Sequence, residues 1–276
     1  MVEASREASE MVEKRVLTSE EKTRSFAWLY NKEMAPVPQD ILDTLAKGPI
    51  DPAKALPAER LNDLLNPGYL EGEVGYCLFP DKSGYVAMLT QMPGVTAEMF
   101  DWWFAWHPLE DLRYAIWAPG RHISAFLSES DRAKHLDESI PLRKRNWGSK
   151  HNIIEWDPTS GMPMLALEAN FISPREFGFD MERFKSPAVA TVLCCSKAGA
   201  RHFPKERMCH FLREVPGGCE LRTRFWISSR ELADGSVTGP LEEEVRALCY
   251  HNASEFHNLA SFLPDLYREQ EGKVTI

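Results

Sequence analysis

The stretch GPLEEEVRALCYHNASEFHNLASFL, residues 239–263, has the pattern of a long amphipathic helix. Gly239 and Pro240 are expected to supply its N-cap and first-turn proline, and the three glutamates that follow suit the positive end of the helix dipole. One stripe then recurs every three or four residues: Leu241, Val245, Leu248, Asn252, Phe256, Leu259 and Leu263. A helix with such a stripe has to pack on another layer.

The preceding segments predict that this layer is an antiparallel sheet. EVGYCLF and GYVAMLTQM, separated by PDKS, are typical of a hairpin, and a helix is expected over TAEMFDWWFAWH. Further strands are expected at RYAIWAP, HNIIEWDP, MPMLALEANFI, VATVLCCSK, ERMCHFLREV and CELRTRFWIS. In the last of these, residues alternate between charged and apolar in period two. The pattern predicts an α+β fold in which the sheet curls around the C-terminal helix and leaves a cavity.

The first 68 residues differ from the rest because they are charged, helix-prone and punctuated by proline. We expect a small N-terminal helical region at 1–68 and a main domain at 69–276. A region with so little core of its own is expected to pack either on the main domain, as a flap, or on a second copy of the chain.

Composition excludes several classes of partner. The chain has 276 residues, of which 43% are hydrophobic and 26% charged, and a formal charge of −9, which argues against a nucleic-acid partner. The short basic run at 143–145 is expected to be a solvated loop. No stretch resembles a signal peptide or a membrane helix, so we expect a cytoplasmic protein with no membrane partner. The six cysteines lie in apolar segments without a CxxC pair and are expected to be reduced core residues.

His251 and Glu255 lie four residues apart, so both side chains leave the same face of the helix. That is metal-ligand geometry. For the pair taken alone, however, a structural role is the better explanation, with His251 capping a neighbouring strand and Glu255 paired to an arginine such as Arg222 or Arg224. His122 after a Pro-Gly turn and Glu155 between apolar neighbours would complete a set of two imidazoles and two carboxylates. Such a set suits zinc or another first-row divalent ion.

Three longer motifs carry a family resemblance: FDWWFAWHPLEDLRYAIWAPGRHISA, MCHFLREVPGGCELRTRFW and HNASE. In order and spacing they resemble the family of 2,4-diacetylphloroglucinol hydrolase and phloretin hydrolase, metal-dependent enzymes that cleave the carbon-carbon bond between an acyl group and a phenolic ring. The resemblance covers roughly Gly68 to Leu263. It implies a helix-grip (Bet v 1-like) fold and an N-terminal region that contributes to a homodimer.

The resemblance also implies the metal ligands, which fall on His122, Glu155, His251 and Glu255, with Zn²⁺ or a similar divalent ion as cofactor. Glu155 has an alternative in Asp157, which shares its strand face two residues further along. A turn residue before proline is the structural explanation of Asp157.

Catalytic roles fall, by the same resemblance, on His210, Tyr114 and the metal-binding Glu155, with Tyr114 also binding substrate. In structural terms His210 is explained as a core histidine and Tyr114 as a packed strand tyrosine. Two substrate-binding positions depart from the family: Phe225 replaces a tyrosine and Ala125 a polar amide. His107 matches a further family position, and we interpret it as a structural histidine at a helix C-terminus.

The predicted function is therefore metal-dependent hydrolysis of an acyl-ring bond in a small phenolic or polyketide substrate. Since Phe225 and Ala125 each remove a hydrogen bond, substrate specificity is expected to differ from the family's. Two alternatives stay open: a non-hydrolytic cyclisation or rearrangement on the same scaffold, and a metal-free ligand-binding protein.

Overall fold

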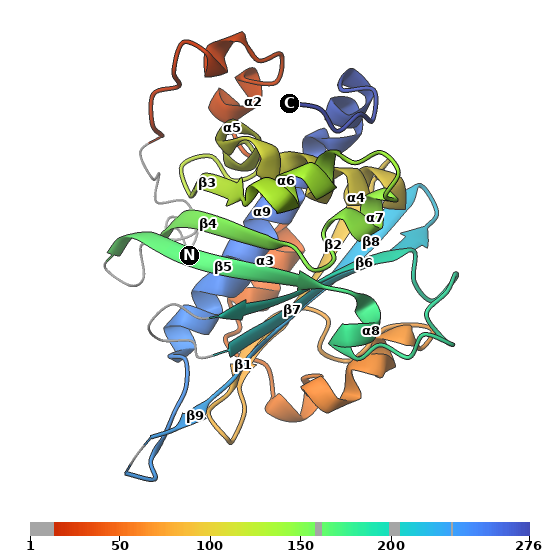
Figure 1. The fold of residues 1–276 in the computed structure, drawn as a ribbon. Helices are drawn as coiled ribbons and strands as arrows, with labels where there is room; N and C mark the ends of the chain where they lie inside the picture. The colour runs from red at the N-terminus through yellow and green to blue at the C-terminus, as the bar shows by residue number, and fades with distance from the viewer. Residues whose placement is uncertain (1–13, 158–161, 199–204, 233) are drawn as a thin grey trace.

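The computed structural model describes residues 14–157, 162–198, 205–232 and 234–276. Figure 1 shows one large, strongly twisted sheet with the long helix α9, Glu242–Glu269, packed against it. All neighbouring strands of this sheet run antiparallel. The predicted α+β, helix-grip (Bet v 1-like) arrangement is confirmed.

The helices and strands have the following bounds. The helices, with η marking a 3-10 helix, are η1 (Glu21–Thr23), α2 (Trp28–Asn31), α3 (Gln39–Leu45), η2 (Pro52–Lys54), η3 (Ala58–Leu65), α4 (Ala97–Trp106), η4 (His107–Leu109), α5 (Asp111–Ala115), α6 (Glu129–Leu136), α7 (Leu142–Arg145), α8 (Pro174–Phe177) and α9. The strands are β1 (Gly75–Leu78), β2 (Gly84–Pro93), β3 (His122–Leu127), β4 (Lys150–Asp157), β5 (Met162–Ile172), β6 (Thr191–Ala198), β7 (Lys205–Val215), β8 (Gly218–Ile227), β9 (Arg230–Glu231) and β10 (Val237–Thr238).

The main sheet has the strand order β1-β2-β8-β7-β6-β5-β4-β3. Strands β3 to β8 form a meander, and β2 pairs with β8 along its whole length, from Gly84 opposite Ile227 to Pro93 opposite Gly218. This pairing joins the N-terminal hairpin to the last long strand. It leaves β1 and β3 as the two edges of the sheet.

The strand expected at RYAIWAP is wrong, because Asp111–Ala115 forms the helix α5. Leu112 and Ala115 are fully buried on one side of this short helix. Arg113 is buried as well, and its guanidinium donates to the backbone oxygen of Thr275 at 2.7 Å. Tertiary packing of this kind overrides the weak strand preference of an apolar run.

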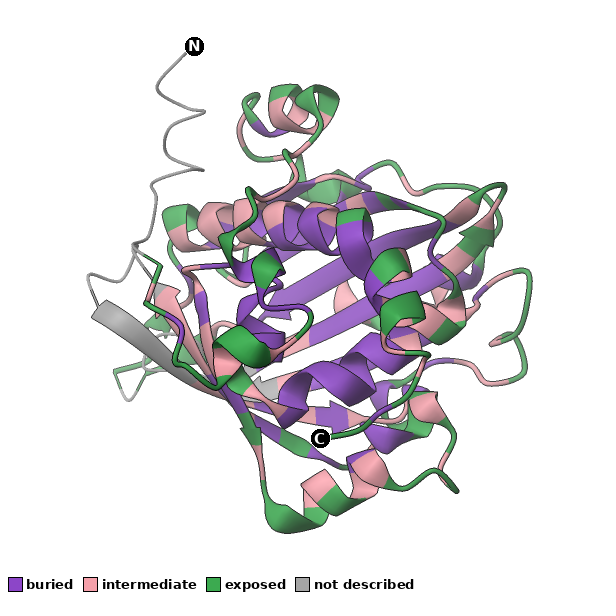
Figure 2. Cartoon of the chain, turned by 90° about the horizontal axis from the view of Figure 1, so that it is seen from above, coloured by how far each residue is buried: buried purple, intermediate pink, exposed green. Residues whose placement is uncertain are grey.

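The C-terminal helix begins two residues later than expected. Leu241 is the N-cap, and its backbone N–H donates to the carboxylate of Glu244 at 2.7 Å. Leu241 itself is 58% exposed and does not join the stripe, whereas Val245, Phe256 and Leu259 are fully buried. Figure 2 shows that buried residues gather on the strands of the sheet and on the helices packed against it.

The basic run at 143–145 was expected to be a solvated loop. Arg143 and Lys144 are exposed, as expected, but the run is helical and Arg145 is buried. The run lies in α7, and the guanidinium of Arg145 donates to the backbone oxygens of His135 and Ile140, both at 2.9 Å. The six cysteines are free and buried, as predicted. Within the described ranges, no helix has both the length and the apolar character needed to cross a membrane.

The N-terminal residues pack on both sides of the same molecule. Phe26 and its neighbours join the core that contains α4, α5 and α9, and the Phe26 ring lies 5.0 Å from that of Trp106. Residues 55–65 instead cover the opposite face of the sheet, where Leu56 accepts a hydrogen bond from Trp226 at 2.7 Å. The outer face of β2, β7 and β8 is thereby buried.

A buried ion cluster lies under this cover. Arg222 and Arg224, on the outer face of β8, each donate to one carboxylate oxygen of Glu73 at 2.5 Å. Burial alone would raise the pKa of Glu73, but the charges of Arg224 and Arg222 hold it at about 2. The alternation of charged and apolar residues in β8 therefore separates two buried faces.

Glu73→Gln is expected to lower the free energy of unfolding by about 3 kcal/mol, because two buried guanidinium groups lose their anionic partner. The folded pKa of Glu73 lies below its ordinary value of 4.5, so wild-type stability from this carboxylate is present above pH 4.5 and declines as the pH falls toward 2. Urea unfolding at several pH values measures both effects.

The matched control for Glu73→Gln is Glu71→Gln. Glu71 forms an exposed ion pair with Lys54, in which its side chain is 68% exposed. Its replacement should change stability by less than about 1 kcal/mol. Equal losses in the two variants would contradict a special role of the buried cluster.

Candidate metal centre

Four side chains from three elements meet between the sheet and α9. His122 is the first residue of β3, and in the pairing of β3 with β4 its direct partner is Glu155. His251 and Glu255 come from adjacent turns of α9. The sheet edge therefore supplies two of the groups and the helix the other two.

The four ligand atoms are close together. The Nε2 atom of His122 lies 3.4 Å from His251 Nε2, 3.4 Å from Glu255 Oε2 and 3.9 Å from Glu155 Oε1. His251 Nε2 lies 3.7 Å from Glu255 Oε2. Tetrahedral ligands at zinc distances are separated by about 3.3–3.4 Å. The spacing of these atoms is therefore close to that of ligands around a single ion.

The protonation and charge of the cluster also fit a divalent metal. Burial lowers the pKa of His251 to about 4, so its imidazole is neutral at pH 7 and has a lone pair to offer. The carboxylates of Glu155 and Glu255 are only 18% and 8% exposed, and a cation would offset their mutual repulsion. Two imidazoles and two carboxylates form a set that zinc and related ions accept.

Tyr114 lies directly behind two of these groups. Its hydroxyl donates a hydrogen bond to Glu155 Oε1, and its ring stacks on that of His122 with centroids 4.1 Å apart and an interplanar angle of 1°. Burial, followed by the negative charge of Glu155, raises the pKa of Tyr114 well above 10. The phenol therefore stays protonated and orients the carboxylate.

Two further side chains donate hydrogen bonds to Glu255, and no role at the site was predicted for either of them. Asn252 donates from Nδ2 to Glu255 Oε1 at 3.1 Å, which leaves Oε2 as the oxygen that faces the histidines. The indole of Trp117 donates to the backbone oxygen of Glu255 at 3.0 Å. The one sequence feature that could have indicated a role for Asn252 is its position in the middle of an otherwise apolar stripe. The bond from Asn252 fixes the direction of the carboxylate, whereas the bond from Trp117 holds the backbone of α9 at this residue.

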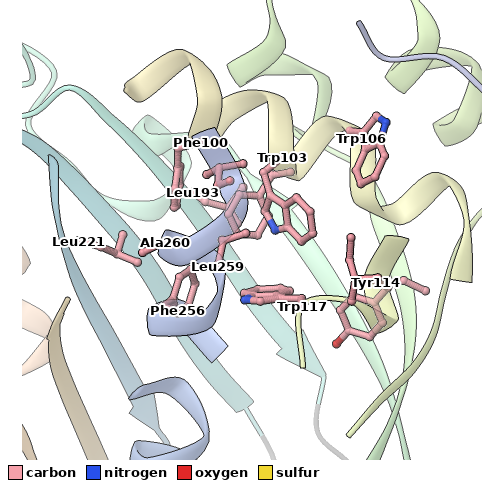
Figure 3. Packing of buried hydrophobic residues seen from close by; sticks show 14 of the residues in the cluster. Phe100, Trp103, Trp106, Tyr114, Trp117, Leu193, Leu221, Phe256, Leu259 and Ala260 are labelled. Carbon is pink, nitrogen blue, oxygen red and sulfur yellow. The ribbon is translucent and has the colours of Figure 1, made fainter. Parts of the chain in front are cut away.

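His210 lies on β7 and is surrounded by aromatic rings. The centroid of its imidazole is 4.6 Å from that of Phe256, 6.0 Å from Phe104 and 6.1 Å from Phe225. Trp117 links this cage to the candidate metal centre, because its ring lies 5.1 Å from Phe256 and 5.0 Å from His122. Figure 3 shows Trp117 between Phe256 and Tyr114.

Phe225 and Ala125, the two positions expected to differ from the family, also face the core. Ala125 is 2% exposed and pairs with Ile153, two residues from Glu155 on β4. Phe225 is equally buried and meets His210 edge to face. The side chain of Asp157, the alternative to Glu155, lies outside the described residues.

Arg222, Arg224 and His107 have partners outside this cluster. Arg222 and Arg224 bind Glu73 on the outer face of the sheet, so their suggested pairing with Glu255 is wrong. His107 is buried at the end of α4, and its Nδ1 atom lies 2.9 Å from the backbone oxygen of Trp103. Burial lowers the pKa of His107 to about 3, which fits a neutral structural histidine.

The chain is similar to several known proteins. The family description "DAPG hydrolase PhiG domain" matches residues 56–268. Phloretin hydrolase from Eubacterium ramulus is 33% identical over 266 residues, covering 91% of this chain and 92% of that protein. 2,4-Diacetylphloroglucinol hydrolase from a Pseudomonas species is 32% identical over 267 residues, with coverages of 90% and 89%. Among solved structures, Ara h 8.0201 is similar with a TM-score of 0.42 and 11% identity, covering 66% of this chain and 99% of that one. The extent of the first three matches shows that the chain belongs to the DAPG hydrolase family.

Proposed function

We propose that this protein is a metal-dependent hydrolase that cleaves the carbon-carbon bond between an acyl group and a phenolic ring. The convergence of His122, His251 and Glu255, with ligand atoms 3.4–3.7 Å apart, is the observation that carries the proposal. The named activities of the two relatives support the substrate class. His122, Glu155, His251 and Glu255 would hold the ion, with zinc or another first-row divalent metal as the fitting cofactor.

The reaction needs water and two proton transfers. The oxygen of water bonds to the acyl carbon, the bond from that carbon to the ring breaks, and the ring carbon takes up a proton. The products are a carboxylic acid and the deacylated phenol. When bound, a divalent metal lowers the pKa of water and polarises an acyl carbonyl.

The side chains divide the remaining tasks. Tyr114, held protonated by its raised pKa, keeps Glu155 in place and presents a phenol beside the centre. His210, inside the aromatic cage, moves the proton that the ring carbon requires. The rings of Phe225 and Phe256 beside it offer an apolar surface to a phenolic ring.

Substrate preference follows from the same residues. Phe225 and Ala125 cannot hydrogen-bond a phenolic or carbonyl oxygen, so we propose a less hydroxylated or bulkier substrate than those of the relatives. The proposal also includes a cytoplasmic homodimer formed through residues 1–68. Val16 and Trp28, which are 83% and 56% exposed, support an interface in this region.

Hydrolysis in ¹⁸O-labelled water tests the reaction. We expect the metal-loaded protein to cleave a member of a panel that contains 2,4-diacetylphloroglucinol, phloretin and analogues with fewer ring hydroxyls. The released carboxylic acid should carry one ¹⁸O atom, because the new carbon-oxygen bond comes from water. Mass spectrometry of the acid measures the label, and unlabelled acid incubated with the protein corrects for exchange.

The other outcomes separate the alternatives. A rearranged or cyclised product without label would support the non-hydrolytic function and contradict ours. A purified protein that binds these phenols, holds no metal and converts none of them would support a ligand-binding role.

A further inference from the structure

The group within hydrogen-bond distance of Nδ1 is of a different kind in His210 than in three other histidines. In His107, His135 and His257, Nδ1 lies 2.6–2.9 Å from a backbone carbonyl oxygen. A carbonyl can only accept, so these neutral rings carry their proton on Nδ1. Nδ1 of His210 instead lies 2.9 Å from the hydroxyl oxygen of Thr223, which can accept or donate.

The strand pairing places these two side chains together. His210 on β7 and Thr223 on β8 are direct partners in the register, and both point to the side of the sheet that faces α9. Thr223 is fully buried and His210 is 3% exposed. In the part of the chain that the structure describes, His210 is the one hydrogen-bond partner of the Thr223 hydroxyl.

This isolation decides the direction of the hydrogen bond. If the Thr223 hydroxyl accepted from Nδ1–H, its own proton would be buried without an acceptor, at the cost of an unsatisfied donor. If it donates to Nδ1, its proton is satisfied and the neutral ring carries its proton on Nε2. The second arrangement satisfies the buried hydroxyl proton, so the position of the proton on the ring follows from the hydrogen bond to Thr223.

The same hydroxyl also serves the charged form of the ring. When His210 gains a proton, Nδ1 becomes a donor, and the hydroxyl can turn and accept from it. The aromatic rings near His210, those of Phe104, Phe225 and Phe256, stabilise a charged imidazolium much less than a hydrogen bond to an oxygen does. Thr223 therefore stabilises both states of the imidazole.

We propose that Thr223 is a positioning residue that keeps the resting proton of His210 on Nε2, opposite to the other three histidines, and holds the ring when it becomes charged. The inference rests on the proposed function, because it assumes that His210 transfers a proton. Nε2 is then the nitrogen that presents the proton to the substrate, and Thr223 is the residue that determines which nitrogen carries it.

The tautomer can be observed directly in the zinc-loaded wild-type protein. Histidine labelled with ¹⁵N gives distinct signals for protonated and unprotonated ring nitrogens, and the spectrum of His210→Ala identifies the His210 signals by their loss. We expect Nε2 to be protonated and Nδ1 unprotonated. The opposite assignment, with the proton on Nδ1, would overturn the proposal without any variant of Thr223.

The matched variants are Thr223→Val, which keeps the shape and removes the hydroxyl, and Thr223→Ser, which keeps the hydroxyl. A hydrogen bond to a charged group is worth about 10- to 100-fold in rate, so kcat of Thr223→Val should fall by that factor. KM and metal content should change little. Thr223→Ser should recover kcat to within a few-fold of wild type.

The result separates this inference from the function it builds on. If His210→Ala loses turnover while Thr223→Val matches wild type, the role of Thr223 is wrong and that of His210 stands. If His210→Ala turns over normally, the proposed role of His210 fails first. A Thr223→Ser variant as slow as Thr223→Val would show that packing matters and the hydroxyl does not.

Discussion

His251→Ala is expected to lose metal and activity together while the protein stays folded. The variant removes the nitrogen that lies 3.4 Å from His122 Nε2 and 3.7 Å from Glu255 Oε2. A metal supplies several kcal/mol of transition-state stabilisation, so kcat/KM should fall on the order of 10³-fold or more. Alanine favours a helix, so α9 should persist. Elemental analysis, substrate turnover and thermal unfolding measure the three effects.

His257→Ala is the matched control for this experiment. His257 lies on the same helix, six residues further along, and its Nδ1 contacts the backbone oxygen of Ala253. Its replacement is expected to leave metal content and turnover close to wild type. A His251→Ala variant without metal but with full activity would contradict the proposed function. An equal loss of metal in both variants would point to damage of α9 rather than to loss of a ligand.

His210→Ala is expected to keep the metal and lose turnover. His210 is linked to His122 through the rings of Phe256 and Trp117. A side chain that transfers protons in the transition state contributes about 10²- to 10⁴-fold, so kcat should fall by a factor in that range. Steady-state kinetics and metal analysis on the same preparation measure the two properties.

His210→Gln refines the comparison, because glutamine keeps a polar side chain inside the aromatic cage and cannot gain or lose a proton near neutral pH. It should be as slow as the alanine variant if proton transfer is the role of His210. Unchanged turnover in either variant would remove His210 from the mechanism. Loss of metal in both would assign it a structural role near the centre instead.

Several local features could be predicted from the residues because they depend on short-range periodicity. The spacing of His251 and Glu255 put both groups on one helix face, and the hairpin of β1 and β2 followed from its turn. The cysteines were recognisable as core residues from their apolar neighbours. Each of these inferences needs only the geometry of one element.

The errors have a common physical origin in packing between distant segments. The chain around Tyr114 has strand-like composition, yet it is a helix because Arg113 and its neighbours are buried against the C-terminal residues. Arg145 was expected in solvent, but the backbone oxygen of His135 needs a donor and binds it. Such partners lie many residues away and leave no local pattern.

The residues by themselves were sufficient for the class of fold, the four metal-binding candidates and their family resemblance, since periodicity and motif spacing are properties of the linear chain. Only the tertiary structure decided that Glu155 lies opposite His122, that Asn252 turns one oxygen of Glu255 toward the histidines, and that Thr223 meets His210. Strand register and the approach of α9 to the sheet set these contacts. Both arise from the free energy of burying the whole core, which no single segment encodes.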